Sequence, residues 1–408
     1  MIGEILGELV WSACETVGEA FIEAIITPDK EVRAAKKAGA KKAGKIIKDG
    51  GIVAFPTETV YGLGADAFNP EAVSRIYMAK GRPNDNPLIL HIAKKDKFFE
   101  LAENPPEYAK KLIDVYWPGP LTLVVRKKLG LPSWLGSFPQ NQTETIGIRM
   151  PKNTIARVII EYSKTVVAAP SANKAGKPSP TAVSHISFEN KKAATPLCGA
   201  WGSAPLSDGN CESNFLANEI DMIVDGGTTT IGLESTVVDV TGDTPIILRP
   251  GAVTAEMIKK TTGIAPIIQT DSTNTPKSPG MKYRHYAPNA PMTIISGDRK
   301  DVVDYMYEKT LKNIANGKKV GLLVTNSTKE LMKKAKLFEG FRGKNIKIIT
   351  FGDEFEIIAQ KLFASLRQFD TLEVSEIFAE AVPNTGLGEA IMNRMFKAAE
   401  GRVEVVTT

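Results

Sequence analysis

The stretch Gly50-Gly51-Ile52-Val53-Ala54-Phe55-Pro56-Thr57 decides how the fold begins. A helical pattern rich in Ala, Lys and Ile runs from about Glu31 to Lys48, and the two glycines end it. The apolar run Ile52–Phe55 then predicts a short buried strand, which Pro56 and Thr57 end. A helix followed by a buried strand and a polar loop is typical of an α/β fold.

The same alternation of short apolar runs and helical patterns continues to about residue 266, which predicts one α/β domain over residues 31–266. The runs that we interpret as strands are Leu88–Ile92, Leu121–Val125, Ile146–Arg149, Val166–Ala169, Met222–Val224 and Val237–Val240. Residues 187–218 have neither period and contain several Gly, Pro, Ser and Asn, so we expect an insertion loop there.

A second pattern of this kind covers residues 292–408 and predicts a small doubly wound, Rossmann-like α/β/α domain. Strands are expected at 292–295, 320–325, 346–350 and 377–381, and helices at 300–314, 354–368 and 388–400. No GxGxxG motif follows the first strand, so the domain is not an obvious dinucleotide binder.

Residues 267–291, between the two domains, read as a linker rich in Thr, Ser, Asn, Pro and Gly. Its second half, Ser278–Pro288, contains Tyr, Arg, His and Tyr in a row. A simple tether has no need of such side chains, so we expect this part to be ordered against another part of the chain.

Composition restricts the class of protein. The 408 residues are 43% hydrophobic and 24% charged, which is ordinary for two soluble domains. The net charge of +5 does not by itself indicate nucleic-acid binding. Three isolated cysteines and three scattered histidines form no disulfide framework and no metal motif, so we expect a cytoplasmic protein without a protein-bound metal.

Residues 1–30 predict an amphipathic helical extension, because apolar residues recur every three or four positions and acidic residues occupy the rest of its surface. The acidic residues and the interrupted apolar pattern fit neither a signal peptide nor a transit peptide. The chain has no apolar run of about 18 residues, so we expect no membrane span.

Short polar motifs interrupt the first domain, mostly where an apolar run ends, and loops at strand ends are where α/β proteins bind ligands. Together they supply guanidinium and ammonium groups, hydroxyls and an amide, a set that suits a ligand rich in phosphate and carboxylate. The motifs are Pro56–Leu63, Lys80-Gly81-Arg82-Pro83, Arg149-Met150-Pro151, Pro170-Ser171-Ala172-Asn173, Ser179-Pro180-Thr181, Leu233-Glu234-Ser235-Thr236 and Arg249-Pro250-Gly251.

Each motif alone has an ordinary structural explanation. The Lys80–Pro83 motif is compatible with a solvated turn, and Ser171 and Asn173 are compatible with a helix cap. Ser235 is compatible with a plain strand hydroxyl, and His91 with a core histidine. The chain has no P-loop motif, no GxSxG and no cysteine–histidine pair, so neither a Walker-type nucleotide site nor covalent catalysis is indicated.

Taken in order, the motifs resemble a YrdC-type domain, a twisted open α/β fold with a basic concave cavity. With Ser278–Pro288 and the sequence NTGLGEAIMNRMFKA at 384–398, the chain resembles the long two-domain form of the threonylcarbamoyl-AMP synthase family. The resemblance covers roughly residues 35–186 and 219–403.

The resemblance also implies roles for single residues. The KxR and SxN tetrad of the family falls on Lys80, Arg82, Ser171 and Asn173, with Lys80 and Arg82 as catalytic residues. Contacts with ATP are implied for Lys80, Asn84, Thr145, Ser171, Asn173, Ser179, Arg249 and His285. Contacts with threonine are implied for Thr57, His91, Arg149 and Ser235. The segment Ser278–Pro288 is implied to be a lid over the cavity.

The implied reaction condenses L-threonine, bicarbonate and ATP, which carries Mg²⁺, into threonylcarbamoyl-AMP and pyrophosphate. The product serves the N6-threonylcarbamoyladenosine modification of tRNA. The implied protein partner is the tRNA-threonylcarbamoyl transferase complex, and tRNA itself would be contacted at most indirectly. Adenylyl transfer of this kind depends mainly on positioning and on neutralising phosphate charge.

Two other functions fit part of the sequence. A carbamoyl-adenylate former of the hydrogenase-maturation type resembles the chain only over the YrdC-type part, and it carries zinc-finger CxxC pairs that this chain lacks. A non-catalytic RNA-binding module would use the basic face. However, the motifs here are interleaved with hydroxyls rather than with stacking aromatic residues, and only 7% of the residues are aromatic.

Overall fold

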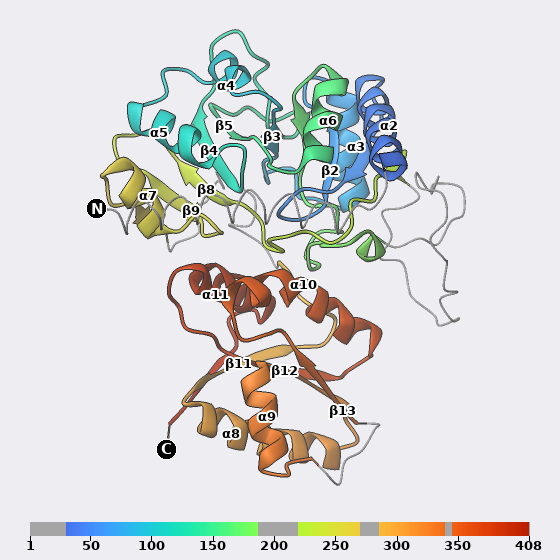
Figure 1. The fold of residues 1–408 in the computed structure, drawn as a ribbon, viewed down its shortest axis with the longest axis vertical. Helices are drawn as coiled ribbons and strands as arrows, with labels where there is room; N and C mark the ends of the chain where they lie inside the picture. Colours follow the sequence, from blue (N-terminus) through green and yellow to red (C-terminus); the bar gives the residue numbers. More distant parts are fainter. Residues whose placement is uncertain (1–29, 187–218, 270–284, 339–344, 408) are drawn as a thin grey trace, which may run out of the picture.

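The computed structural model describes residues 30–186, 219–269, 285–338 and 345–407, which form two sheets with their helices (Figure 1). The expected N-terminal extension, the expected insertion at 187–218 and residues 270–284 of the expected linker lie outside the described residues. Within the part that is described, no helix is long and apolar enough to cross a membrane.

The first sheet mixes parallel and antiparallel neighbours, and its described strands follow the order β10-β9-β8-β4-β5-β3-β6-β2-β1-β7. Their bounds are β1 Val53–Phe55, β2 Gly62–Asp66, β3 Ile89–His91, β4 Leu121–Arg126, β5 Thr145–Arg149, β6 Val167–Ala168, β7 Met222–Ile223, β8 Thr236–Asp239, β9 Ile246–Arg249 and β10 Ile267–Ile268. All of β1 is buried, as the apolar run of its sequence predicts.

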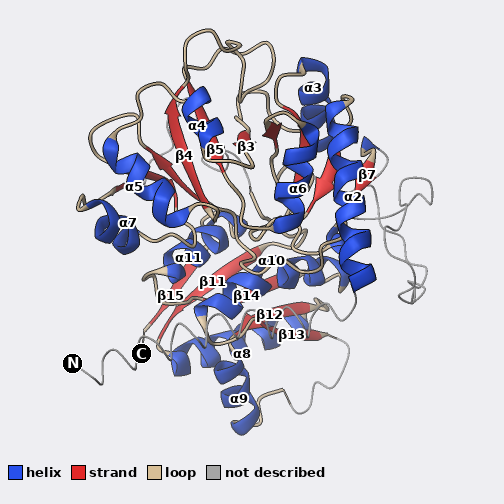
Figure 2. Ribbon diagram, turned by 45° about the horizontal axis from the view of Figure 1, so that its top comes forward, coloured by secondary structure: helices blue, strands red, loops and turns tan. Residues whose placement is uncertain are grey.

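The described helices of this domain are α2 Lys30–Lys48, α3 Pro70–Lys80, α4 Asp96–Leu101, α5 Glu107–Tyr116, α6 Thr154–Ser163 and α7 Ala255–Thr262. Helices α2 and α6 lie side by side (Figure 2). They approach closely at Gly44, where a Cβ atom would lie 2.6 Å from the carbonyl oxygen of Ile159. Glycine at this position is what allows the two backbones to meet.

The second sheet is wholly parallel and has the order β13-β12-β14-β11-β15. Its strands are β11 Met292–Gly297, β12 Val320–Val324, β13 Ile346–Thr350, β14 Glu376–Glu380 and β15 Val403–Val406, and its helices are α8 Arg299–Ala315, α9 Asn326–Lys334, α10 Phe355–Thr371 and α11 Leu387–Ala398. Helices cover both faces of the sheet (Figure 1). The strand order differs from the dinucleotide-binding order 3-2-1-4-5-6, because the fourth strand, β14, lies between the first and the second.

Helices α10 and α11 face the first domain, and α8 and α9 lie on the opposite face of the second sheet (Figures 1 and 2). The buried side chains of Val60, Leu233 and Tyr286 belong to the same apolar cluster as those of α10 and α11. Gly232 has a φ of +81°, and a Cβ there would lie 2.4 Å from the Cα of Gln360. The two domains therefore share a packed core.

Of the described strands and the helices of the second domain, the sequence patterns did not predict β2, β9, β10, β15 and α9, and β10 lies at the start of the expected linker 267–291. Strand β2 has the sequence GLGAD, and two glycines in five residues hide a strand pattern. Gly64 is needed there, because a Cβ would lie 2.5 Å from the ring of Phe55. Three of the four residues of β15 are exposed, so β15 lacks the burial that produces an alternating pattern.

Candidate active site

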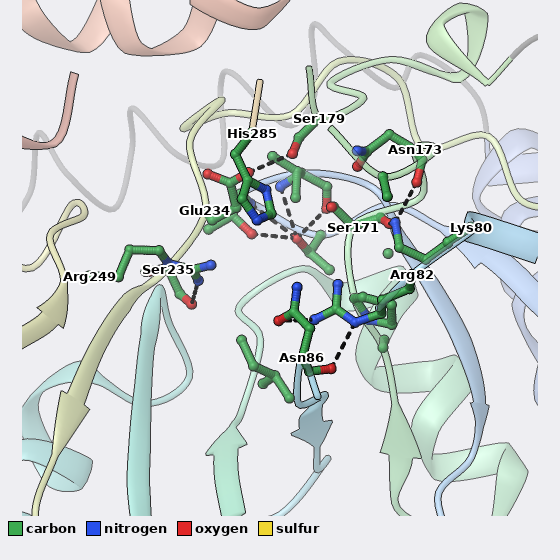
Figure 3. Close-up of a pocket in the computed structure, with 18 of the residues that line it drawn as sticks. Lys80, Arg82, Asn86, Ser171, Asn173, Ser179, Glu234, Ser235, Arg249 and His285 are labelled. Carbon is green, nitrogen blue, oxygen red and sulfur yellow. Dashed lines mark hydrogen bonds between the residues drawn. The ribbon is translucent and has the colours of Figure 1, made fainter. Parts of the chain in front are cut away.

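One cavity gathers most of the polar motifs of the first domain, together with the end of the linker (Figure 3). Its volume is about 100 Å³. The polar side chains that line it are Thr57, Thr59, Lys80, Arg82, Asn86, His91, Arg149, Ser171, Asn173, Ser179, Glu234, Ser235, Arg249, His285 and Tyr286. Four of these are lysine or arginine and one is a carboxylate, so the lining is strongly basic.

The end of α3 delivers the first two cations. Asn69 caps the helix at its start by accepting from the backbone N–H groups of Glu71 and Ala72. Gly81, in the left-handed region at φ 59°, ends the helix directly after Lys80. This sharp stop puts Lys80 on the last turn and Arg82 in the following loop, both in the cavity wall.

The ammonium group of Lys80 donates to the backbone carbonyls of Ser171 and Asn173. It is buried, with 2% of the residue exposed. This burial, followed by the nearby charges of Arg82 and Lys174, lowers the pKa of Lys80 well below its usual value of 10.5. A bound anion would offset these effects, so Lys80 is suited to a phosphate group.

The guanidinium of Arg82 is held by backbone and side-chain oxygens of its own loop. Its Nε donates to the carbonyl of Asn86 at 3.0 Å, and its Nη2 donates to Oδ1 of Asn86 at 2.8 Å and to the carbonyl of Pro87 at 2.6 Å. Three such bonds fix the plane of the guanidinium at the cavity wall.

Two buried polar atoms in the wall find no hydrogen-bond partner among the described residues: Oδ1 of Asn173 and Nε2 of His285. Buried polar atoms are nearly always paired, so these two are suited to bind a ligand. Burial, followed by the positive charges of Arg82 and Lys397, lowers the pKa of His285 to about 3. His285 is therefore neutral at physiological pH and contributes hydrogen bonds rather than charge.

The loop after β1 and the end of β5 form another part of the wall. Nη1 of Arg149 donates to Oγ1 of Thr59 at 2.9 Å, and Nη2 lies 2.6 Å from Oε1 of Glu58. Burial acts to raise the pKa of Glu58, but the charge of Arg149 more than offsets it, so the pKa is lowered. Thr57 closes the loop by donating to the carbonyl of Val60 at 2.7 Å.

His91 is buried beside this ion pair. Its Nδ1 lies 3.2 Å from the carbonyl oxygen of Ile89, so Nδ1 carries the proton of the neutral ring. Burial, followed by the charge of Arg149, lowers the pKa of His91 to about 3. The ring is therefore neutral near pH 7 and is a weak base.

Ser235, directly before β8, and Arg249, at the end of β9, complete the lining. Nη2 of Arg249 donates to Oγ of Ser235 at 3.1 Å, and its Nε donates to the carbonyl of Ser235 at 3.0 Å. Oγ of Ser235 is also 2.8 Å from Oγ1 of Thr122. These contacts hold Ser235 and Arg249 together, opposite Lys80 and Asn173 in the close-up view (Figure 3).

The structure brings eleven of the thirteen residues selected from the sequence into this lining; Asn84 and Thr145 are outside it. Asn84 is exposed, and its carbonyl accepts from Nδ2 of Asn141 at 2.7 Å. Thr145 begins β5, and its carbonyl accepts from Oγ1 of Thr143.

Sequence reasoning missed Thr59, Asn86, Glu234 and Tyr286. Thr59 and Glu234 belong to polar motifs that the sequence already indicates, so the neighbouring residues of each motif could have identified them as site residues. Asn86 has no comparable signal, because its role depends on the position of Arg82 in the folded loop.

The donor set does not form a metal site. No group of three His, Cys, Asp or Glu able to hold a metal ion occurs among the described residues. The carboxylate in the lining, that of Glu234, already accepts from Ser179 at 2.5 Å and pairs with Arg394 at 3.1 Å. A divalent ion in this cavity would therefore be held mainly by the phosphates of a substrate.

The sheet order of the first domain and the basic, hydroxyl-rich cavity agree with the class of YrdC-like domains. Residues 45–197 and 202–251 match the family model described as "Telomere recombination", and residues 253–400 match that of the threonylcarbamoyl-AMP synthase C-terminal domain. The chain belongs to the two-domain form of the threonylcarbamoyl-AMP synthase family, whose members are nucleotidyltransferases.

Two relatives and one solved structure document this membership. The threonylcarbamoyl-AMP synthase of Pyrococcus abyssi is 40% identical over 364 residues, which is 88% of this chain and 94% of that protein. The threonylcarbamoyl-AMP synthase of Bacillus subtilis is also 40% identical, over 89% of this chain and 93% of that protein. The crystal structure of P. abyssi Sua5 complexed with L-threonine superposes with a TM-score of 0.77 at 39% identity, and the match covers 91% of this chain and 97% of that one.

Proposed function

We propose that this chain condenses L-threonine, bicarbonate and ATP into threonylcarbamoyl-AMP and pyrophosphate in the cavity described above, and that it does so in the cytoplasm. The observation that carries the proposal is the convergence of four cationic side chains with several hydroxyls in one cavity of a chain of this family. Cations of this kind neutralise phosphates, and hydroxyls recognise an amino acid that has a hydroxyl of its own.

The reaction has two bond-forming steps. The amine nitrogen of threonine attacks the carbon of bicarbonate, and loss of water gives a carbamate. A carbamate oxygen then attacks the α-phosphorus of ATP, the bond to the bridging oxygen of the β-phosphate breaks, and pyrophosphate leaves with the electron pair. Mg²⁺ arriving on the ATP phosphates would neutralise part of the developing charge.

The residues of the cavity would position the reactants and balance their charge. We assign the phosphates to Lys80 and Arg82, with Ser171, Asn173, Ser179, Arg249 and His285 as further ATP contacts. Threonine is assigned to Thr57, His91, Arg149 and Ser235. Asn84 and Thr145 remain proposed ATP contacts that would need the nucleotide to extend beyond the lining. No general base is assigned, and the two lining histidines have low pKa values that make them suited to hydrogen bonding.

The cavity is small for a nucleotide in this conformation, because its volume of about 100 Å³ is far below the roughly 300–1,000 Å³ of typical ligand pockets. His285 and Tyr286 form part of the wall and come from the linker rather than from the rigid sheet. We therefore propose that the linker end moves as a lid, which would also protect the labile carbamate and the mixed anhydride from water.

The test is pyrophosphate release by the purified protein with ATP, Mg²⁺ and bicarbonate. Release should require both L-threonine and bicarbonate, and serine and valine should support it poorly, because each lacks one of the two groups that threonine carries on Cβ. Lys80→Ala and Arg82→Ala should abolish release while the circular dichroism spectrum stays unchanged. A folded protein that releases no pyrophosphate with any amino acid would contradict the proposed function.

The product would pass to the tRNA-threonylcarbamoyl transferase complex, so we propose that tRNA is contacted at most indirectly. RNA binding can be titrated against salt with the same preparation. Tight, salt-sensitive RNA binding by a protein without pyrophosphate release would instead favour an RNA-binding module.

A further inference from the structure

Arg394, on α11 of the second domain, is fully buried, and most of its hydrogen bonds reach the first domain. Its Nε lies 3.1 Å from Oε2 of Glu234, and its Nη1 donates to the carbonyl of Pro250 at 2.7 Å. Its Nη2 lies 3.4 Å from the carbonyl oxygen of Glu234. One guanidinium therefore holds two of the polar motifs of the first domain, those around Glu234 and Pro250.

Glu234 connects Arg394 to the cavity. Its second carboxylate oxygen, Oε1, accepts from Oγ of Ser179 at 2.5 Å. Its chain neighbour is Ser235, which also lines the cavity. In the close-up view, Glu234 lies beside Ser179 and His285 at one rim of the cavity (Figure 3). A side chain of the second domain thus determines where two hydroxyls of the cavity lie.

The charge of Glu234 gives this contact a chemical consequence. Burial acts to raise the pKa of Glu234, but Arg394 and then Arg249 more than offset it, so the pKa is lowered and the group is an anion. Other cations lie within range of this anion, because the charge of Glu234 also acts to raise the pKa values of Arg249 and Lys80. Pairing with Arg394 directs the carboxylate toward the second domain. Without Arg394, the same carboxylate would neutralise cations that ATP needs.

We propose that Arg394 is a positioning residue of the active site: by binding Glu234, it fixes Ser179 and keeps the carboxylate from competing with the ATP phosphates. The second domain then completes the active site of the first. This inference rests on the proposed function, because it assigns the cavity cations to ATP. Arg394 is fully buried and absent from the cavity lining, so it acts on the substrates through Glu234.

A purely structural role for Arg394 is the competing explanation, since breaking a buried ion pair is costly whatever the pair does. The two explanations differ in the substrate affected. Loss of positioning should act on ATP, whereas a loosened domain interface should lower activity without preference for one substrate. They differ also in the effect of neutralising Glu234, because Glu234→Gln removes the competing charge but cannot restore the contacts that Arg394 makes with Pro250.

The experiment measures kcat, the KM for ATP and the KM for threonine of the full chain carrying Arg394→Met, Glu234→Gln or both. Arg394→Met should raise the KM for ATP at least about tenfold and that for threonine less than about twofold. The double variant should return the KM for ATP to within about threefold of the starting value. Gln360→Ala is the matched control, because it removes a 3.1 Å interdomain bond to the carbonyl of Thr229 without touching Glu234. It should leave both KM values unchanged.

The inference is overturned if folded Arg394→Met keeps the original KM for ATP, or if Glu234→Gln fails to reverse its rise. If Arg394→Met does not fold, Arg394→Lys replaces it: a smaller rise in the KM for ATP, again reversed by Glu234→Gln, supports the inference, and no rise overturns it. The unmodified protein is assayed first. Its failure to release pyrophosphate would contradict the proposed function, whereas an active protein with an unaffected Arg394 variant would contradict only this inference.

Discussion

The Oε1 atom of Glu58 lies 2.6 Å from Nη2 of Arg149, and the two side chains are only 6% and 5% exposed. The pair joins the loop after β1 to the end of β5. Arg149 also donates to Oγ1 of Thr59, and the backbone N–H of Asn153 donates to Oε2 of Glu58. Both partners are buried, so the loss of one leaves a buried charge.

We expect Glu58→Gln to lower stability by about 3 kcal/mol, because removing one partner of a buried ion pair typically costs about 3–5 kcal/mol and the amide retains a hydrogen bond. The pKa of Glu58 is lowered from 4.5, so its contribution to stability is present above that pH and is lost as pH falls through the lowered pKa. Melting temperatures measured from about pH 7 to about pH 3 should therefore depend less on pH in the variant.

Glu161→Gln is the control for this series, because Glu161 is exposed on α6 and its replacement should leave the pH dependence unchanged. Some acid dependence will remain in Glu58→Gln, because Glu234 also has a lowered pKa. A variant whose melting curve follows the original at every pH would show that the ion pair contributes nothing net to folding.

Lys80 should couple ATP binding to proton uptake. Its pKa is lowered in the free protein by burial and by the charges of Arg82 and Lys174. Bound phosphates would raise it, so binding takes up a proton in the pH range between the two values, and affinity falls as pH rises through that range. Calorimetric titration of ATP in buffers of different ionisation enthalpy measures the protons taken up.

Two variants separate Lys80 from the other ionisable groups. Lys80→Arg keeps its charge at every accessible pH, so proton uptake should disappear even though binding weakens. Lys174→Gln removes a neighbouring positive charge and should move the loss of ATP affinity to higher pH. Proton uptake that is unchanged in Lys80→Arg would assign the coupling to another group.

How much of the structure the sequence predicts depends on how far apart in the chain the interacting residues lie. Strand β1 follows from four apolar residues in a row, and the end of α3 at Lys80 follows from Gly81. These signals are local. The contact between Arg394 and Glu234 joins residues 160 positions apart in different domains, and no periodicity encodes it. In the sequence, Arg394 is simply one residue of an amphipathic helix.

The same distinction explains the strands. Strand β2 forms because Gly64 admits the ring of Phe55 at close range, a contact that exists only after β1 and β2 have paired. The motifs around the cavity were recognisable as an ordered set that resembles one family, whereas each motif alone has an ordinary structural explanation. Their mutual geometry required the ten-strand order, in which β8 pairs with β4 and β9 pairs with β8, although more than 100 residues separate β4 from β8.

Gly44 should be required for the packing of α2 on α6 and not for catalysis. In Gly44→Ala, the new Cβ would lie 2.6 Å from the carbonyl oxygen of Ile159 and 2.7 Å from Cβ of Tyr162. Alanine gains about 1 kcal/mol of helix propensity over glycine. Overpacking that moves two backbones apart costs about 1–3 kcal/mol or more, so we expect a net loss of stability.

Urea unfolding measures this loss, and the KM values of the folded variant should stay unchanged. Gly242→Ala is the control, because the added Cβ meets no atom within 4 Å and its φ is not positive. An equally stable Gly44→Ala would mean that moving the two helices apart costs only about the 1 kcal/mol that alanine gains in helix propensity.

Ser235 should determine the affinity for threonine through its hydroxyl. The Oγ of Ser235 accepts from Arg249 at 3.1 Å and lies 2.8 Å from Oγ1 of Thr122, and all three residues are buried. Ser235→Ala leaves these partners without their bond, at a cost of about 1–3 kcal/mol. If Ser235 also contacts threonine, the KM for threonine should rise about tenfold or more while the KM for ATP changes little.

Thr122→Val distinguishes a substrate contact from a structural network. It removes the other hydroxyl of the same 2.8 Å bond at nearly constant volume, and Thr122 is not part of the cavity lining. Arg249 still holds Ser235 in this variant, so the KM for threonine should stay within about threefold of the original value. Equal rises in Ser235→Ala and Thr122→Val would mean that the bond between the two hydroxyls, rather than a contact between Ser235 and the amino acid, is what matters for threonine binding.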